Sequence, residues 1–110
     1  CAVCAPLKDA DPDFPFTVEK RQGAPRPKPA KAGGSDHAYF AINGVPTIGF
    51  NLKDPKGYDF SYGEIWHTER DTYNKSIPEY QEHTAICTAV VLYGLANLDH
   101  ILSREGLYAE

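Results

Sequence analysis

The sequence has no methionine, one tryptophan and only three cysteines among its 110 residues. Three cysteines are too few, and too odd a number, for the disulfide framework of a small secreted domain. No apolar run approaches the ~20 residues that a membrane-spanning helix needs, so we expect no membrane span. The N-terminus lacks the basic and continuous apolar parts of a signal peptide. Because 15 acidic residues outnumber 11 basic ones and no dense basic face is present, nucleic acid is not expected as a partner.

The remaining composition is that of a globular chain with one core. Apolar residues make up 42% of the sequence, which at this length allows a single domain. Because the chain begins at Cys1 and has no methionine, we expect it to be a piece of a longer polypeptide. Cys1 and Cys4 have C-x-x-C spacing, which fits a redox pair, half of a zinc site or two incidental thiols. No second C-x-x-C motif accompanies them, so incidental thiols are the default interpretation.

Prolines divide the chain into two parts. Six of the nine prolines lie within residues 1–32. Proline fixes φ and removes a hydrogen-bond donor, so this part cannot be mostly helix or central strand. We predict one short strand over residues 16–20, followed by an extended, solvated stretch over residues 23–34. Residues 1–34 are therefore assigned to a proline-rich irregular segment, and residues 35–110 to a more regular domain.

Residues 35–65 carry the signals of a helix, a strand and a long loop. Ser35 is a suitable N-cap, and Asp36 in the first turn suits the positive end of a helix. Asn43-Gly44 ends this helix, because glycine tolerates a positive φ. The apolar run over residues 45–50 predicts a strand buried on both faces. Residues 51–65 then form a loop long enough to be functional.

A long helix is expected over residues 78–103. Pro78 is tolerated in the first turn of a helix, and Gly106 follows its end. An apolar stripe recurs at three- and four-residue spacing through Tyr80, Thr84, Cys87, Val91, Leu95, Leu98 and Leu102. A helix of this length needs a broad surface to pack on, so the sequence predicts the final portion of a larger α/β domain.

Two clusters contain the residues best suited to chemistry. One is Ser35-Asp36-His37 and the other is the run over residues 66–72. A histidine in either cluster can act as a metal ligand or a general base, because its pKa lies near neutrality. A metal-bound imidazole also needs ordered neighbours, which Thr68 or Asp71 can supply around His67.

Three segments in a fixed order connect these clusters to a known family. Residues 34–40 read GSDHAYF, residues 43–50 read NGVPTIGF and residues 66–72 read WHTERDT. Together with the long terminal helix, they resemble the C-terminal part of the M28 family of zinc aminopeptidases. In that family an SDH helix-strand unit precedes an HT-x-x-D-T motif and a final helix. The resemblance covers about residues 33–103, roughly two-thirds of the chain.

The resemblance implies both a fold and a set of roles. The fold is a three-layer αβα zinc-exopeptidase architecture, a mixed sheet with packed helices, of which this chain is a C-terminal fragment. Two zinc ions would activate water against the carbonyl of a peptide substrate, and His67 would ligate one of them. Asp36 and His37 would support catalysis through hydrogen bonds, while Ser35 and Trp66 would contact substrate. A secreted or periplasmic location would also follow.

The sequence departs from the family in its metal ligands. The family requires another histidine, a bridging Asp, further acidic ligands and an adjacent Glu-Glu pair, all before the SDH unit. Here the remaining histidines are His83 and His100, both on the expected terminal helix, and no Glu-Glu pair exists. We therefore predict that these 110 residues alone are inactive and bind zinc weakly. An exposed apolar helix face and an unpaired strand edge also predict self-association.

Two other functions stay open. The WHT sequence resembles zinc-dependent glutaminyl cyclases, in which the indole lies in the substrate pocket; Asp71-Thr72 follows the aminopeptidase pattern more closely. Trp66 is alternatively a core aromatic beneath the loop. The third interpretation is a non-catalytic module that binds peptides or a partner protein, with the basic stretch over residues 20–31 as a docking strand.

Overall fold

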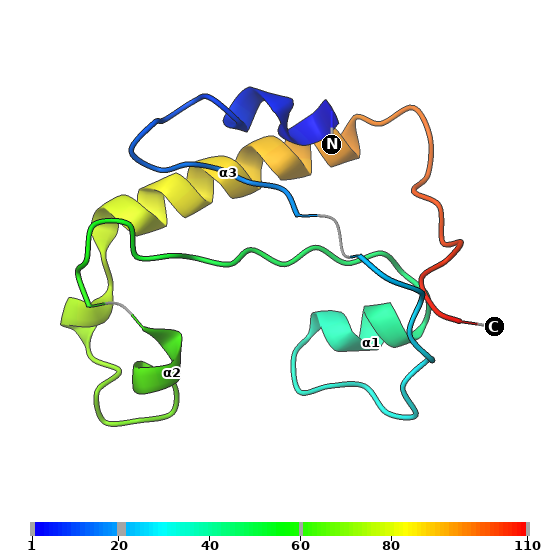
Figure 1. The fold of residues 1–110 in the computed structure, drawn as a ribbon, viewed down its shortest axis with the longest axis horizontal. Helices are drawn as coiled ribbons and strands as arrows, with labels where there is room; N and C mark the ends of the chain where they lie inside the picture. The colour runs from blue at the N-terminus through cyan, green and yellow to red at the C-terminus, as the bar shows by residue number, and fades with distance from the viewer. Residues whose placement is uncertain (1, 20–21, 60, 110) are drawn as a thin grey trace. The chain divides into compact units, whose positions relative to one another are not determined.

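The computed structural model describes residues 2–19, 22–59 and 61–109 (Figure 1). Regular structure in these residues is helical, in the order η1 (Ala2–Leu7), α1 (His37–Ile42), α2 (Tyr62–Ile65), η2 (Tyr73–Lys75) and α3 (Pro78–Ala96). The chain divides into two compact units. The α3 unit comprises Cys1–Val18 and Leu52–Leu98, and the α1 unit comprises Glu19–Asn51 and Asp99–Glu110. None of the described helices is long and apolar enough to cross a membrane.

The expected α/β fold is wrong, because the described residues form no sheet. Residues 45–50, expected as a buried strand, are irregular, and Ile48 and Phe50 within them are exposed. The described part of the expected strand at 16–20 is irregular too, and Lys20 lies outside the described residues. A β contact occurs only as an isolated parallel bridge between Arg26 and Tyr108 among the described residues. A strand needs a neighbour for its N–H and C=O groups, and no described residue forms such a ladder with these segments.

The core of the α3 unit lies between α3 and the N-terminal turn η1, which runs alongside the helix in Figure 1. Leu7, Cys87 and Val91 form the buried cluster, at 5%, 4% and 3% exposure. Partly buried side chains pack around it, namely Cys4, Phe16, Val90 and Leu95. Cys87 and Val91 belong to the predicted apolar stripe, so that stripe does face the core. Cys4 carries a free thiol, whereas Cys1 of the C-x-x-C motif lies outside the described residues.

Helix α3 begins where the sequence predicts and ends earlier. Pro78 occupies the first turn, but the helix stops at Ala96 instead of residue 103. Asn97 ends it by donating from both its backbone N–H and its side-chain amide to the carbonyl of Tyr93, at 3.1 and 2.8 Å. A short polar side chain that bonds the backbone in this way competes with the next helical turn. Leu98 and Leu102 therefore lie beyond the helix.

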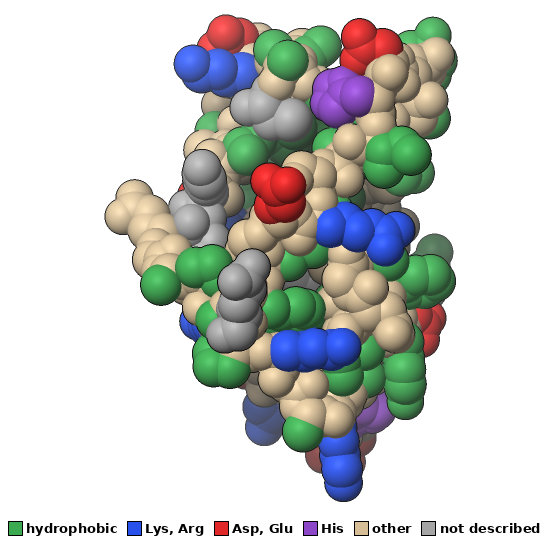
Figure 2. Space-filling view, turned by 90° about the vertical axis from the view of Figure 1, so that its right-hand side faces the viewer, with side chains coloured by type: hydrophobic (Ala, Val, Ile, Leu, Met, Phe, Trp, Pro, Cys, Tyr) green, Lys and Arg blue, Asp and Glu red, His purple; other side chains and the backbone are tan. Residues whose placement is uncertain are grey.

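Much apolar surface of the chain stays open to solvent. On α3, Ile86, Leu92 and Tyr93 are more than half exposed. The space-filling view shows hydrophobic side chains interspersed with charged groups on the face it presents (Figure 2). The described residues therefore bury a narrow core and leave many apolar side chains exposed.

Gly94 lets η1 pack closely against α3. A Cβ built at this position would overlap Cγ1 of Val3 and lie 3.3 Å from its Cβ. Alanine favours a helix over glycine by about 1 kcal/mol, but overpacking against a stiff valine costs about 1–3 kcal/mol. We therefore expect Gly94→Ala to lower the free energy of unfolding, measured in urea. In a Val3→Ala background the loss should be smaller, because the overlap with Cγ1 is gone and only the 3.3 Å contact with Cβ remains. An equal decrease in both backgrounds would contradict the overlap.

The α1 unit places the SDH residues at the start of a short helix. Helix α1 begins at His37 and ends at Asn43-Gly44, where the sequence predicts its end. The Ala38 N–H donates to the Ser35 carbonyl at 2.9 Å and closes a turn at the start of the helix. The expected Ser35 cap is wrong. Asp36 takes the position before the helix with helical dihedral angles and makes no side-chain capping bond. The division of the sequence at residues 34 and 35 stays a prediction.

Candidate functional site

The HT motif lies on a tight turn that follows helix α2. Ile65 at the end of α2 is buried, and the Trp66 N–H closes the last turn on the Tyr62 carbonyl at 3.0 Å. This turn of helix lies inside the stretch that the sequence analysis assigned to a loop. The following residue, His67, has a left-handed backbone with φ of 56°. This conformation costs a residue with a Cβ roughly 1–2 kcal/mol, so neighbouring bonds must hold it.

The hydroxyl of Thr68 makes those bonds. Its Oγ1 lies 2.8 Å from the Ile65 carbonyl and 3.1 Å from the Glu64 carbonyl, so its single proton is shared between the end carbonyls of α2. The same oxygen accepts the Arg70 N–H at 3.2 Å. The Thr68 N–H also donates to the Ile65 carbonyl, at 3.1 Å. One side chain thus joins the backbone on both sides of His67.

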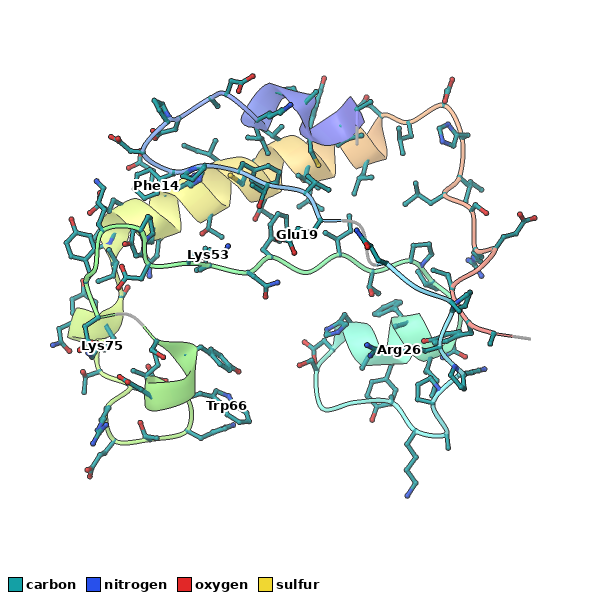
Figure 3. The ribbon with its side chains drawn as sticks, in the orientation of Figure 1. Phe14, Glu19, Arg26, Lys53, Trp66 and Lys75 are labelled. Atoms are coloured by element: carbon teal, nitrogen blue, oxygen red, sulfur yellow. The ribbon has the colours of Figure 1, made fainter. Side chains whose placement is uncertain are left out.

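Three rings stand in a row beside this turn. Tyr62 stacks on Trp66 with centroids 5.6 Å apart and planes inclined by 19°. Trp66 in turn contacts His67 at 4.3 Å and 55°. Tyr62 and Trp66 are 64% and 55% exposed, and the Trp66 side chain projects from the turn after α2 (Figure 3). Trp66 is therefore not a core aromatic, and its indole and the exposed His67 imidazole can both reach a ligand.

A network of polar contacts joins the loop before α2 to helix α3; we call it the clasp, and its members are Asp54, Lys56, Glu79 and Tyr80. The Tyr80 hydroxyl on α3 donates to Asp54 and accepts the Lys56 N–H at 3.1 Å. Lys56 reaches Glu79 with an N–O separation of 2.5 Å and lies over the Phe14 ring at 4.9 Å. The bond from Lys56, followed by that from Tyr58, lowers the pKa of Glu79, while Glu79 raises the pKa of Lys56. Burial first, and then the bond to Asp54, raises the pKa of Tyr80.

The predicted site residues are divided between the two units. Trp66 and His67 belong to the α3 unit, whereas Ser35, Asp36 and His37 belong to the α1 unit. All five are exposed. Within each unit the residues adjacent in sequence lie together: the SDH residues at the start of α1, and the WH pair after α2. Their roles stay predictions.

Sequence reasoning missed three features of this region. They are the stacking of Tyr62 on Trp66, the clasp around Tyr80, and the contact between His83 and Cys87, whose Nδ1 and Sγ lie 3.6 Å apart. Tyr62/Trp66 and His83/Cys87 are each four residues apart, the spacing at which side chains meet on a helix. That spacing was the available signal. The clasp joins residues more than 20 positions apart and had none.

Comparison with known families settles the membership of the chain. The sequence model described as Peptidase family M28 matches residues 14–91, which include all three motif segments and most of α3. The chain belongs to peptidase family M28. No curated protein sequence and no solved structure matches it. Membership of the M28 family indicates a metallopeptidase-related function, and M28 proteins are generally zinc-dependent.

The M28 chain does not contain a complete zinc site in its described part. A catalytic zinc takes three protein ligands of the His, Asp, Glu or Cys type. Within residues 2–19, 22–59 and 61–109, no three such side chains gather closely enough to hold a metal ion. Burial raises the pKa of the Cys87 thiol, whose Sγ lies 3.6 Å from Nδ1 of His83. His67 offers one exposed imidazole, which does not make a site by itself.

Proposed function

We propose that this chain is part of an M28 aminopeptidase, a zinc exopeptidase that removes N-terminal residues from peptides. Its contribution to the metal centre is the imidazole of His67, and the other ligands come from outside these 110 residues. The observation that carries the proposal is the exposed His67 on a hydrogen-bonded turn inside the family match. A neutral imidazole that is accessible and held on a rigid backbone is a suitable zinc ligand.

The charges around the turn support this assignment. Between residues 59 and 72 the sequence has four carboxylates and one guanidinium, and one of these carboxylates, that of Asp59, lies 3.8 Å from the Lys75 ammonium. Such an excess lowers the local potential and favours a divalent cation or the ammonium group of a peptide N-terminus. Ser35, Asp36 and His37 contribute hydrogen bonds to the substrate or its transition state. Trp66 contributes an apolar surface for the substrate.

The isolated chain is inactive under this proposal. One imidazole cannot compete with water for zinc without further ligands on the same rigid frame. Exposed apolar side chains, such as those on the outer face of α3, are consistent with a segment that packs against further polypeptide.

A glutaminyl cyclase is the second candidate, favoured by the position of Trp66. Its indole is 55% exposed and contacts the His67 ring, so it can line a pocket beside a metal ligand. A cyclase would use that surface to hold an N-terminal glutamine side chain.

Substrate assays on the full-length protein loaded with zinc separate the candidates. We expect aminoacyl p-nitroanilides to release nitroaniline, and the activity to disappear after chelation and return with zinc. Ring closure of an N-terminal glutamine peptide with loss of ammonia, and no nitroaniline, would establish the cyclase instead. Absence of both reactions from a zinc-loaded protein would support the non-catalytic binding module. The 110-residue chain serves as the control and should show neither reaction.

A further inference from the structure

We propose that Thr68 is a positioning residue whose hydroxyl holds His67 in the left-handed conformation and so aims its imidazole across the Trp66 ring. The purpose of this role rests on the proposed function of His67 as a metal ligand. The positioning itself does not depend on that function. The motif contains a threonine directly after the histidine, and the structure assigns that threonine a task separate from binding.

The hydrogen bonds of the Thr68 hydroxyl reach backbone groups on both sides of His67. On the N-terminal side its hydroxyl proton is held by the carbonyls of Ile65 and Glu64, which end α2. On the C-terminal side its oxygen holds the Arg70 N–H. His67 lies between these anchors and has little freedom to leave φ of 56° without breaking one of them.

The side chain of Thr68 is itself well defined. A β-branched residue has few χ1 rotamers, so an oxygen bonded on two sides stays in place. Serine can make the same bonds with less restriction at χ1, whereas valine has nearly the same shape and can make none of them. The chemistry of the hydroxyl can therefore be tested separately from the size of the side chain.

The orientation of His67 follows from its backbone. A left-handed residue directs its Cβ differently from a residue in the extended or right-handed helical region. Here the result is a ring contact of 4.3 Å between His67 and Trp66. An imidazole held in one orientation loses less conformational freedom when it binds a ligand. This is the benefit of the hydrogen bonds that Thr68 makes to the backbone on both sides of His67, which we call the clamp.

Nuclear magnetic resonance on the full-length protein without metal tests the clamp. In histidine- and arginine-labelled protein, the His67 ring protons should be shifted by the Trp66 indole, and the Arg70 amide should exchange slowly. Thr68→Val should return the ring protons towards free-histidine positions. It should also speed Arg70 exchange by roughly five- to tenfold, the effect of losing one ordinary hydrogen bond. Thr68→Ser should retain both signals.

Thr84→Val is the matched control, because the Thr84 hydroxyl donates to the Tyr80 carbonyl inside α3 at 2.7 Å. It removes the same kind of bond and should leave the His67 and Arg70 signals unchanged. Equal effects of Thr84→Val and Thr68→Val would overturn the clamp, as would unshifted His67 ring protons in the unsubstituted protein. The latter measurement also decides the matter if Thr68→Val fails to fold. These measurements use metal-free protein, so they test the clamp separately from zinc binding. If the clamp is found but His67 does not bind zinc, only the proposed function is rejected.

Discussion

Replacing His67 with alanine is expected to abolish the zinc-dependent peptidase activity proposed for the full-length protein and to weaken its zinc binding by more than about 100-fold. Changing a residue that merely supports a metal ligand typically costs 10- to 100-fold in affinity, so loss of a ligand should cost at least as much. The imidazole is exposed and stands on a clamped turn, so its removal leaves no buried gap in the α3 unit. Zinc retained after dialysis against a chelator, together with nitroanilide hydrolysis, measures both effects.

His100→Ala is the control for this substitution. Like His67, His100 is an exposed histidine; its Nδ1 lies 2.6 Å from the Asp99 carboxylate, and it is outside the residues that match the family. Its replacement should leave zinc content and activity unchanged. If His67→Ala retains both, the HT motif does not supply a ligand in this protein. Equal losses in the two variants would show a general effect of removing a histidine.

Local signals in the sequence predicted the parts of the fold that are local. Pro78 marks the first turn of α3, and Asn43-Gly44 ends α1, because each acts through its own backbone geometry. The predicted end of α3 was too late, because the apolar spacing continues past Asn97 although the helix does not. The hydrogen bonds from Asn97 to the Tyr93 carbonyl end the helix at that point. The spacing describes a face that a helix can bury, and the cap determines where the helix stops.

The expected strand at residues 45–50 was wrong for a different reason. Its apolar content fits a buried strand, but a strand exists only when another chain segment lies beside it and completes its hydrogen bonds. No described segment of this chain does so, and Ile48 and Phe50 remain exposed. The composition of a segment indicates which secondary structure it can form. Whether it pairs as a strand depends on residues that are distant in sequence or belong to other polypeptide.

The candidate site shows the same limit. The motif located His67, and the structure adds what no motif expresses: the left-handed backbone, the double anchoring by Thr68 and the stacked Tyr62. Thr68 was recognised from sequence as a residue able to order the histidine. The direction of its hydroxyl follows from the end of α2, a four-residue helix inside a stretch whose glycine and proline content predicted a loop.

Leu7→Ala is expected to lower the free energy of unfolding of the chain by about 2–4 kcal/mol, measured by urea denaturation with circular dichroism. Removing a buried leucine side chain forfeits its transfer from water and leaves a cavity, and these effects together cost 2–5 kcal/mol in other cores. Leu7 is 5% exposed and is the buried residue that η1 contributes to the cluster with Cys87 and Val91. The core is small, so the loss should fall in the lower part of that range.

Leu92→Ala supplies the comparison, because Leu92 lies on α3 one residue from Val91 but is 60% exposed. The same atoms are removed, so a change within about 0.5 kcal/mol is expected where no core contact is lost. The difference between the two variants therefore measures the docking of η1 on α3. Equally small losses would mean that Leu7 makes no more core contact than the exposed Leu92 does, and the N-terminal turn would then contribute nothing to the stability of the α3 unit. A large loss confined to Leu7→Ala would show that this unit depends on a contact between residues some 80 positions apart, made by a turn that lies before the family match begins.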